Sequence, residues 1–443
     1  MTTNVKAITD IKSTNLDKVK YILVTYIILA SSGGGLILSD VFFLGFVNLI
    51  LFFAIVLKYN ILKQFMLWQG IIVSFLVLYS IGVSFVFNAT SNYTFFARYI
   101  FVFNIAMISI YYIKEDFFLY YEKAIFVLFV IGLIFFIWQI LDTTLLFNLL
   151  KSFSNLFGIE DSLYMKVRAF NVNAIIYTIN EETYTNIWYM KRNCGFAFEP
   201  GFYSFFLVLA IFVLFYKEGS LKISKRIIFY LFILLTTQST TGILTIFIVF
   251  LFFGFNSINI KNLFVFVILL VLFISVFLYF DFGANKISSV VEENDTITTY
   301  ESAALHSPDG VISMGRIVGF EYYFLKTMKV SPIFGFCGMD KYGHDNDIIG
   351  NLTTANGFSV LLYNFGLLGI LLYVVALYKS CNYLVKKDLK MKMPFFFYLI
   401  VFTYIFSFPV GNTIIMIYFL IYGIRGNLLA EKNLRITKIN REV

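Results

Sequence analysis

Residues 196–216 read FAFEPGFYSFFLVLAIFVLFY, and Glu199 is the only charged residue in this stretch. A helix needs about 20 predominantly apolar residues to cross the hydrocarbon core of a bilayer. This stretch has that length and that composition, and comparable stretches recur between residues 20 and 429. It therefore predicts a membrane-spanning helix in a chain built largely from such helices.

The composition of the whole chain points the same way. Hydrophobic residues make up 60% of the sequence and charged residues only 14%, whereas a soluble domain carries about a quarter charged residues. A surface with so few charges needs lipid around it. The formal net charge of +8 is best explained by basic loops on the cytoplasmic side, so no nucleic-acid partner is expected.

The apolar pattern predicts an all-α integral membrane protein in which residues 1–443 form a single polytopic domain. Its first helix is expected to be an uncleaved membrane span that follows a polar, lysine-containing segment. The pattern predicts twelve spans, at residues 20–38, 40–57, 65–87, 94–113, 121–141, 196–216, 227–239, 242–256, 263–281, 357–378, 395–409 and 411–429.

The distribution of lysine and arginine gives the expected orientation. Basic residues concentrate in alternate short loops, above all in residues 379–394 and in the C-terminal tail, whereas residues 88–93 contain none. Cytoplasmic loops of membrane proteins are enriched in lysine and arginine. The pattern therefore places both termini in the cytoplasm.

Two loops on the opposite, outer side are much longer than simple connections. They comprise residues 142–195 and 282–356, and loops of this length are usually functional. Both are expected to be partly helical. Residues 145–157 suit an amphipathic helix at the membrane interface, and residues 311–328 suit a helix with one apolar side.

Residues 227–256 allow two interpretations because a polar run, Thr-Thr-Gln-Ser-Thr-Thr-Gly, interrupts them at 236–242. A single helix would turn the lysine-rich 379–394 loop to the outer side, against the charge rule. We therefore predict two short helices that meet at a polar turn. Such interruptions are tolerated where they are buried in protein or line a cavity.

The strongest candidate site is Arg192-Asn-Cys-Gly-Phe-Ala-Phe-Glu199-Pro200-Gly201, at the entry to the sixth span. Burying a carboxylate at the start of an apolar span costs free energy unless the carboxylate is paired with another group or has a function. Pro200 suits the first turn of a helix, where free N–H groups can bind an anion. The competing interpretation is that Glu199 caps the helix and Arg192 reaches the lipid headgroups.

The second long loop adds three candidates. Arg316 suits phosphate recognition, because its planar guanidinium can bind two oxygens at once. His344 is a candidate general base, and Asp345 a candidate ligand of sugar hydroxyls or of a cation. Solvated loop side chains are the alternative for each of them.

Arg98 is a further candidate because it falls within the fourth span, where an arginine needs a partner or an aqueous cavity unless it reaches the interface. Metal chemistry is not indicated. The three cysteines and two histidines of the chain are scattered without ligand spacing, so neither a metal nor a cofactor is expected.

These residues and the span pattern resemble the bacterial O-antigen and capsule repeat-unit polymerases (Wzy-type), within a superfamily that includes the O-antigen ligases. The local resemblance rests on Arg192…Gly195-Phe-Ala-Phe-Glu199-Pro200, on the polar break at Thr237–Gly242 with Ser239, and on Gly315-Arg316. It also rests on Asn356…Gly366-Leu-Leu-Gly369, although the histidine that often precedes the asparagine is Ala355 here.

The resemblance implies a GT-C-like polytopic glycosyltransferase of the bacterial inner membrane, which needs no metal and inverts the anomeric centre. Its donor and acceptor are oligosaccharides linked to undecaprenyl diphosphate, and a chain-length regulator protein is an expected partner. Arg192 and Arg316 would neutralise the diphosphate, while Glu199 or His344 would act on the acceptor hydroxyl. Arg98, Ser239, Asp345 and Asn356 would contact substrate.

Two alternatives remain. An O-antigen ligase uses the same donor with a different acceptor, and the absent histidine at 355 argues mildly against it. A polysaccharide flippase belongs to another class of protein. The long outer loops and the lack of an internal repeat argue against transport.

Overall fold

The computed structural model describes most of the helical part of the chain. The described residues are 15–33, 36–58, 61–87, 92–113, 116–156, 172–179, 191–218, 223–256, 271, 297–305, 312–314, 316–338, 352–354, 356–383, 401, 403–405 and 407–425. Among them, four helices are long and apolar enough to cross a membrane: α3 (Leu62–Phe87), α4 (Tyr93–Ile113), α5 (Phe117–Leu141) and α16 (Gly357–Tyr383). The chain is thus a mostly helical protein with membrane-spanning character.

Shorter apolar helices fall where the sequence predicts further spans. They are α1 (Asn15–Ala30), α2 (Val41–Leu51) with its π-helical continuation η2 (Phe52–Leu57), α9 (Pro200–Glu218), α10 (Lys225–Thr237), α11 (Thr240–Asn256) and the C-terminal helix Ile414–Arg425. The first helix ends at Ala30, earlier than predicted. Gly33 then takes φ +68°, and the short 3-10 helix η1 (Leu36–Ser39) follows. The predicted spans 263–281 and 395–409 lie largely outside the described residues, so the number twelve stays a prediction.

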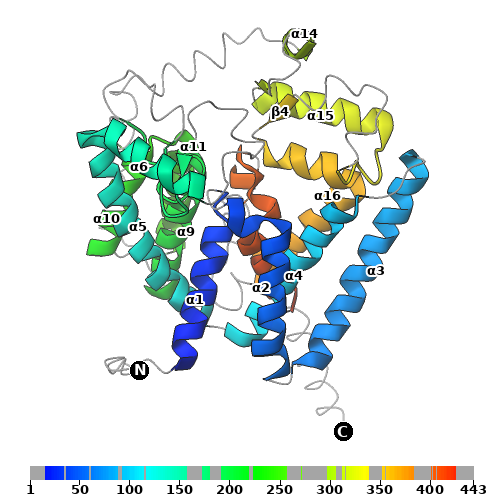
Figure 1. Cartoon of the computed structure of the whole chain (residues 1–443), viewed down its shortest axis with the longest axis horizontal. Helices are drawn as coiled ribbons and strands as arrows, with labels where there is room; N and C mark the ends of the chain where they lie inside the picture. The colour runs from blue at the N-terminus through cyan, green and yellow to red at the C-terminus, as the bar shows by residue number, and fades with distance from the viewer. Residues whose placement is uncertain are drawn as a thin grey trace.

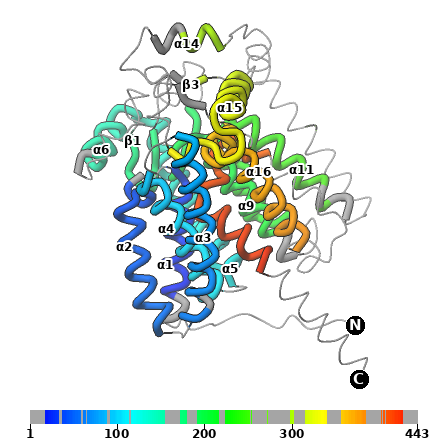
Figure 2. The backbone as a smooth tube through the Cα atoms, turned by 90° about the vertical axis from the view of Figure 1, so that its right-hand side faces the viewer, coloured from blue at the N-terminus to red at the C-terminus, as the bar shows by residue number. Residues whose placement is uncertain are grey.

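The helix ends lie at two opposite ends of the molecule, which differ in the residues found there. At one end, which we call the basic end, Lys20 Nζ lies 2.7 Å from Asp116 Oδ2 and the Arg425 guanidinium lies 4.1 Å from the centre of the Tyr111 ring. At the other, the loop end, lie α6 (Thr143–Leu156), α14 (Ile297–Leu305) and α15 (Arg316–Val330), as Figures 1 and 2 show. The described parts of both long loops therefore share one end, and the side of a membrane that this end faces stays a prediction.

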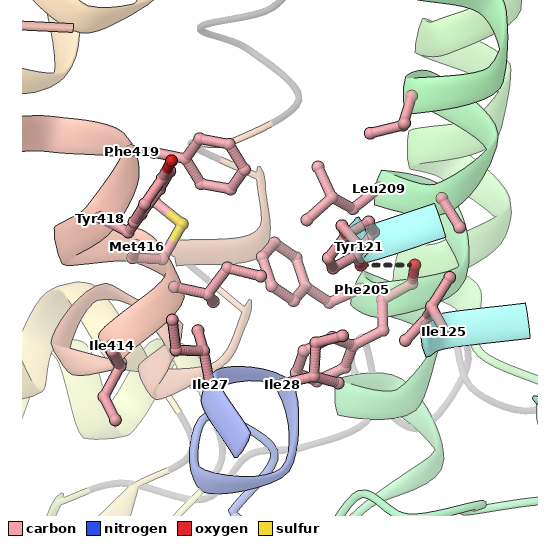
Figure 3. Close-up of a cluster of buried hydrophobic side chains, with 14 of the residues drawn as sticks. Ile27, Ile28, Tyr121, Ile125, Phe205, Leu209, Ile414, Met416, Tyr418 and Phe419 are labelled. Carbon is pink, nitrogen blue, oxygen red and sulfur yellow. Dashed lines mark hydrogen bonds between the residues drawn. The ribbon is translucent and has the colours of Figure 1, made fainter. Parts of the chain in front are cut away.

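The core lies where α1, α5, α9 and the C-terminal helix meet (Figure 3). Its side chains include Ile27 of α1, Ile125 of α5 and Phe205 of α9. Tyr121 donates a hydrogen bond to the carbonyl of Phe206 at 3.2 Å, and the rings of Phe117 and Tyr418 stack with centres 4.0 Å apart. By contrast, α3, α5 and α16 carry many exposed apolar side chains, as expected of surfaces covered by lipid.

Short strands organise the two long loops. Strands β1 (Val172–Asn173) and β2 (Thr178–Ile179) form an antiparallel hairpin in the first loop. In the second loop, β3 (Ile312–Met314) pairs in parallel with β4 (Leu352–Thr354), with Ile312 opposite Leu352. This pairing brings the start of α15 next to the start of α16. The helix predicted at 145–157 is confirmed as α6. The helix predicted at 311–328 is confirmed from Arg316 as α15, whereas Ile312–Met314 at its predicted start form β3 instead.

Two interruptions occur among the helices that the structure describes. The predicted break in 227–256 is confirmed, because α10 ends at Thr237 and α11 begins at Thr240. The sequence does not predict the second break: α16 loses helical geometry at Gly366, which has φ 61° and ψ −166°. Residues 332–338 pack their backbone into this break, with the Phe336 N–H donating to the Tyr363 carbonyl and the Leu367 N–H to the Pro332 carbonyl.

Candidate functional site

The break between α10 and α11 is held by two residues of the first long loop. Gln238 takes the left-handed conformation (φ 49°) and ends α10, which leaves the last carbonyls of α10 without helical partners. The Arg192 Nε donates to the Thr237 carbonyl at 3.3 Å, and the Asn193 N–H donates to the Thr236 carbonyl at 3.0 Å. A cation is well placed here, because the C-terminal end of a helix is its negative end.

Ser239 begins α11 from the other side of this break. Its hydroxyl accepts the N–H of Gly242 at 3.1 Å, as an N-cap residue does. It also accepts a hydrogen bond from the Ser204 hydroxyl of α9 at 3.2 Å, and Ser204 in turn lies 3.2 Å from the Tyr404 hydroxyl. Ser239 is 3% exposed, so in this state it joins helices rather than facing solvent.

The first turn of α9 stands beside the break. The helix begins at Pro200, as predicted, and the Glu199 carbonyl accepts the first helical N–H, that of Tyr203, at 2.9 Å. Glu199 is half-buried. A Cβ atom on Gly201 would come within 2.1 Å of the Phe408 ring, so glycine at this position lets that ring lie against the turn.

Arg316 lies near the same turn of α9, with the Phe408 ring between its guanidinium and Gly201. Its guanidinium lies 4.8 Å from the ring centre, a cation–π distance, and the ring lies against Gly201. Arg316 is half-buried. Its guanidinium is therefore one aromatic ring away from the first turn of α9.

Asn356 fixes this position of Arg316. It is fully buried, donates its side-chain N–H to the Arg316 carbonyl at 3.3 Å and accepts the Ser359 N–H at 3.1 Å. The nitrogen and the oxygen of its amide both form hydrogen bonds. Asn356 therefore caps the N-terminus of α16 and binds the backbone at the start of α15. Asn356 thus positions Arg316, and its predicted contact with substrate stays a prediction.

The structure brings together five of the eight predicted site residues: Arg192, Glu199, Ser239, Arg316 and Asn356. Arg98 lies apart, exposed in the second turn of α4. His344 and Asp345 lie outside the described residues. In the resulting site, Arg192 (8% exposed) lies at the α10–α11 break and Arg316 lies one aromatic ring from the first turn of α9. Two cations close to a helix N-terminus favour an anionic ligand.

Sequence reasoning missed two residues of this site. Asn193 is fully buried and bonds the Thr236 hydroxyl at 3.0 Å, but a lone asparagine beside a stronger Arg–Glu motif carries no signal. Phe408 packs against the Arg316 guanidinium. An aromatic residue in an apolar span is common, so the sequence does not identify Phe408 as part of a site. Its neighbours Pro409 and Gly411 do signal an interruption, and η8 (Pro409–Asn412) is found there.

A comparison with known proteins finds no matching family model, no matching curated protein and no matching solved structure.

Proposed function

We propose that this chain is a membrane glycosyltransferase of the polysaccharide-polymerase type. It transfers a growing glycan from undecaprenyl diphosphate to a lipid-linked repeat unit, and the product is a lipopolysaccharide or capsule chain. The proposal places the loop end on the periplasmic side of the bacterial inner membrane and both termini in the cytoplasm, with a chain-length regulator as an expected partner.

One observation carries the proposal. Arg192 and Arg316 come from different long loops. Arg192 bonds the end of α10 at the α10–α11 break, which the Ser204–Ser239 hydrogen bond joins to the start of α9, and Arg316 lies one aromatic ring from the first turn of α9. A lipid-linked diphosphate needs neutralisation at the level where its lipid meets water. Arginines and a helix N-terminus supply that charge in an environment of low dielectric, where preorganised electrostatics contribute most to catalysis.

The reaction assigns each group a task. An acceptor hydroxyl oxygen attacks the anomeric carbon of the donor from the face opposite the diphosphate, and the bond from that carbon to the diphosphate breaks. The electron pair leaves with the diphosphate, which Arg192 and Arg316 stabilise. The hydroxyl proton passes to the carboxylate of Glu199 or to His344.

The test removes each arginine in turn. In a strain that lacks the native gene, Arg192→Ala and Arg316→Ala are expected to lower long-chain surface glycan about 100-fold or more, the usual effect of removing one transition-state-stabilising group. Lys329→Ala is the matched control, because Lys329 is an exposed cation on the same helix as Arg316. Variant and control are compared at equal membrane level on a gel of surface glycan.

The same gel separates the other functions. A polymerase defect leaves a single repeat unit attached, a ligase defect leaves nothing attached, and a flippase defect leaves no glycan outside. Undiminished long chains in both arginine variants would rule the proposal out.

A further inference from the structure

Helix α6 follows α5 after a single residue and has three distinct sides. Its buried side contacts β1 of the hairpin and includes Leu146 (0% exposed) and Leu150 (2%). A second side is exposed and apolar, with Leu145, Leu149 and Phe153 at 55%, 49% and 45% exposure. The third side is exposed and polar, and it consists of Thr144, Asn148, Lys151 and Ser152.

The apolar side continues a surface that already suits lipid. The last turns of α5, a candidate membrane span, expose Ile134, Ile137, Ile140 and Leu141, the last at 79%. The stripe on α6 begins four residues beyond Leu141. Trp138, half-buried in the same turns of α5, is of the residue type enriched at membrane–water interfaces.

The bend between the two helices is built into the structure. The carboxylate of Asp142 accepts the Leu145 N–H at 2.9 Å, and the Thr143 hydroxyl donates to the Gln139 carbonyl at 2.6 Å. These bonds start a new helix at once, so α6 turns away from the direction of α5 (Figure 1).

We propose that α6 lies in the lipid–water interface at the loop end. Leu145, Leu149 and Phe153 insert into the acyl region of that leaflet, and the Asn148–Lys151 side faces headgroups and water. Interfacial helices sit with the apolar face about 5–10 Å deep in this boundary. Lipid is the expected partner of the Leu145–Leu149–Phe153 stripe, because the stripe extends the lipid-facing surface of α5. A polar side flanks the stripe, and an interfacial helix needs such a side to face water.

This lipid contact is coupled to the candidate site. Leu146 and Leu150 pack against the hairpin residues Val172 and Tyr177, and the Thr178 N–H donates to the Gly195 carbonyl at 2.8 Å. Gly195 lies between Arg192 and the first turn of α9. The position of α6 in the leaflet therefore sets the depth of Arg192, whatever reaction the site performs.

The experiment measures depth at neighbouring positions of the full-length protein in phosphatidylcholine–phosphatidylglycerol nanodiscs. Leu149→Cys and Asn148→Cys are each labelled with an environment-sensitive nitrobenzoxadiazole dye, and lipids brominated high on the acyl chain serve as quenchers. Both side chains are exposed, so neither label disturbs the core. The native cysteines are buried, and labelled wild-type protein gives the background.

The label at Leu149 is expected to emit at shorter wavelength and to lose several-fold more emission to the brominated lipids than the label at Asn148. Ile137→Cys, on the exposed surface of α5, should be quenched at least as strongly as Leu149→Cys. Equal quenching at 148 and 149, or water-like emission at 149, would overturn the proposal. Absence of quenching at 137 would overturn it too, because the stripe on α6 is proposed to extend a lipid contact that α5 already makes.

Discussion

Two of the described helical segments are interrupted at the loop end, and the two interruptions differ in the balance of side-chain and main-chain groups that stabilise them. At the α10–α11 break, the side chains of Arg192 and Asn193 bond residues 237 and 236, and one main-chain hydrogen bond joins the Asn193 N–H to the Thr236 carbonyl. At the α16 break, most partners are main-chain groups, to which the Tyr79 hydroxyl and the Cys337 thiol add one hydrogen bond each. Four main-chain hydrogen bonds of 2.7–3.2 Å join residues 332–337 to residues 363–368.

This difference separates an interruption whose partners can exchange from one that serves as a scaffold. Inside a membrane protein, backbone groups freed by a break must find partners. Side chains can exchange those partners when a ligand arrives, and Arg192 adds a charge. Backbone partners are neutral and cannot exchange without moving the chain. We therefore expect the first break to respond to side-chain changes and the second to respond to changes that displace its backbone.

The largest effect is expected from Gly366→Ala, at the second break. The backbone angles of Gly366 fall in a region that only glycine occupies readily, and a Cβ atom there would lie 2.4 Å from the Ile333 carbonyl. We expect a loss of about 2–4 kcal/mol in the free energy of unfolding, from strain and overpacking together. The measurement is thermal or denaturant unfolding in detergent.

Gly70→Ala is the matched control for this substitution. Gly70 lies within α3, and a Cβ atom there would meet nothing within 4 Å, so alanine is expected to stabilise the helix by about 0.5–1 kcal/mol. If Gly366→Ala unfolded at the wild-type midpoint, the close backbone packing at the second break would be wrong.

A smaller effect is expected from Asn193→Ala, at the first break. The substitution removes the hydrogen bond to the Thr236 hydroxyl and the acceptor that holds the Gly195 N–H at 2.9 Å. We expect a loss of about 1–3 kcal/mol, the usual result of leaving buried polar groups unsatisfied. The same unfolding assay and the surface-glycan gel measure stability and activity together.

Asn364→Ala tests the comparison directly, since Asn364 contributes its main-chain carbonyl to the second break. We expect its effect on stability to stay within about 0.5 kcal/mol. Equal losses in Asn193→Ala and Asn364→Ala would contradict the distinction between a side-chain break and a backbone break.

The same distinction explains what can be predicted from sequence. The α10–α11 break is predictable, because its polar run stands out against an apolar background and the charge rule demands an extra turn. Arg192, Glu199 and Arg316 stand out because charges are rare in this chain. The α16 break cannot be predicted, because Gly366 among apolar residues reads as a tolerated helical glycine and its partners lie in a different segment. Phe408 and Asn193 are missed because their roles depend on neighbours distant in the sequence.

The smallest effect at neutral pH concerns Cys337, in the segment that fills the second break. Burial raises the pKa of its thiol from 9.0 to about 12, and its Sγ donates to the Asn364 carbonyl at 3.0 Å. The thiol thus stays protonated in the folded chain above pH 9, where the unfolded chain has lost the proton. Its contribution to stability is therefore complete below pH 9 and falls as the pH rises from 9 toward 12, by about 1.4 kcal/mol per pH unit.

Cys337→Ser tests this titration, because serine keeps a hydroxyl donor and does not ionise in this range. The midpoint of thermal unfolding should fall less steeply above pH 9 in the variant than in the wild type. Parallel curves for the two proteins would show that the thiol is not enclosed by the break, and the second break would then be open to solvent rather than filled by backbone.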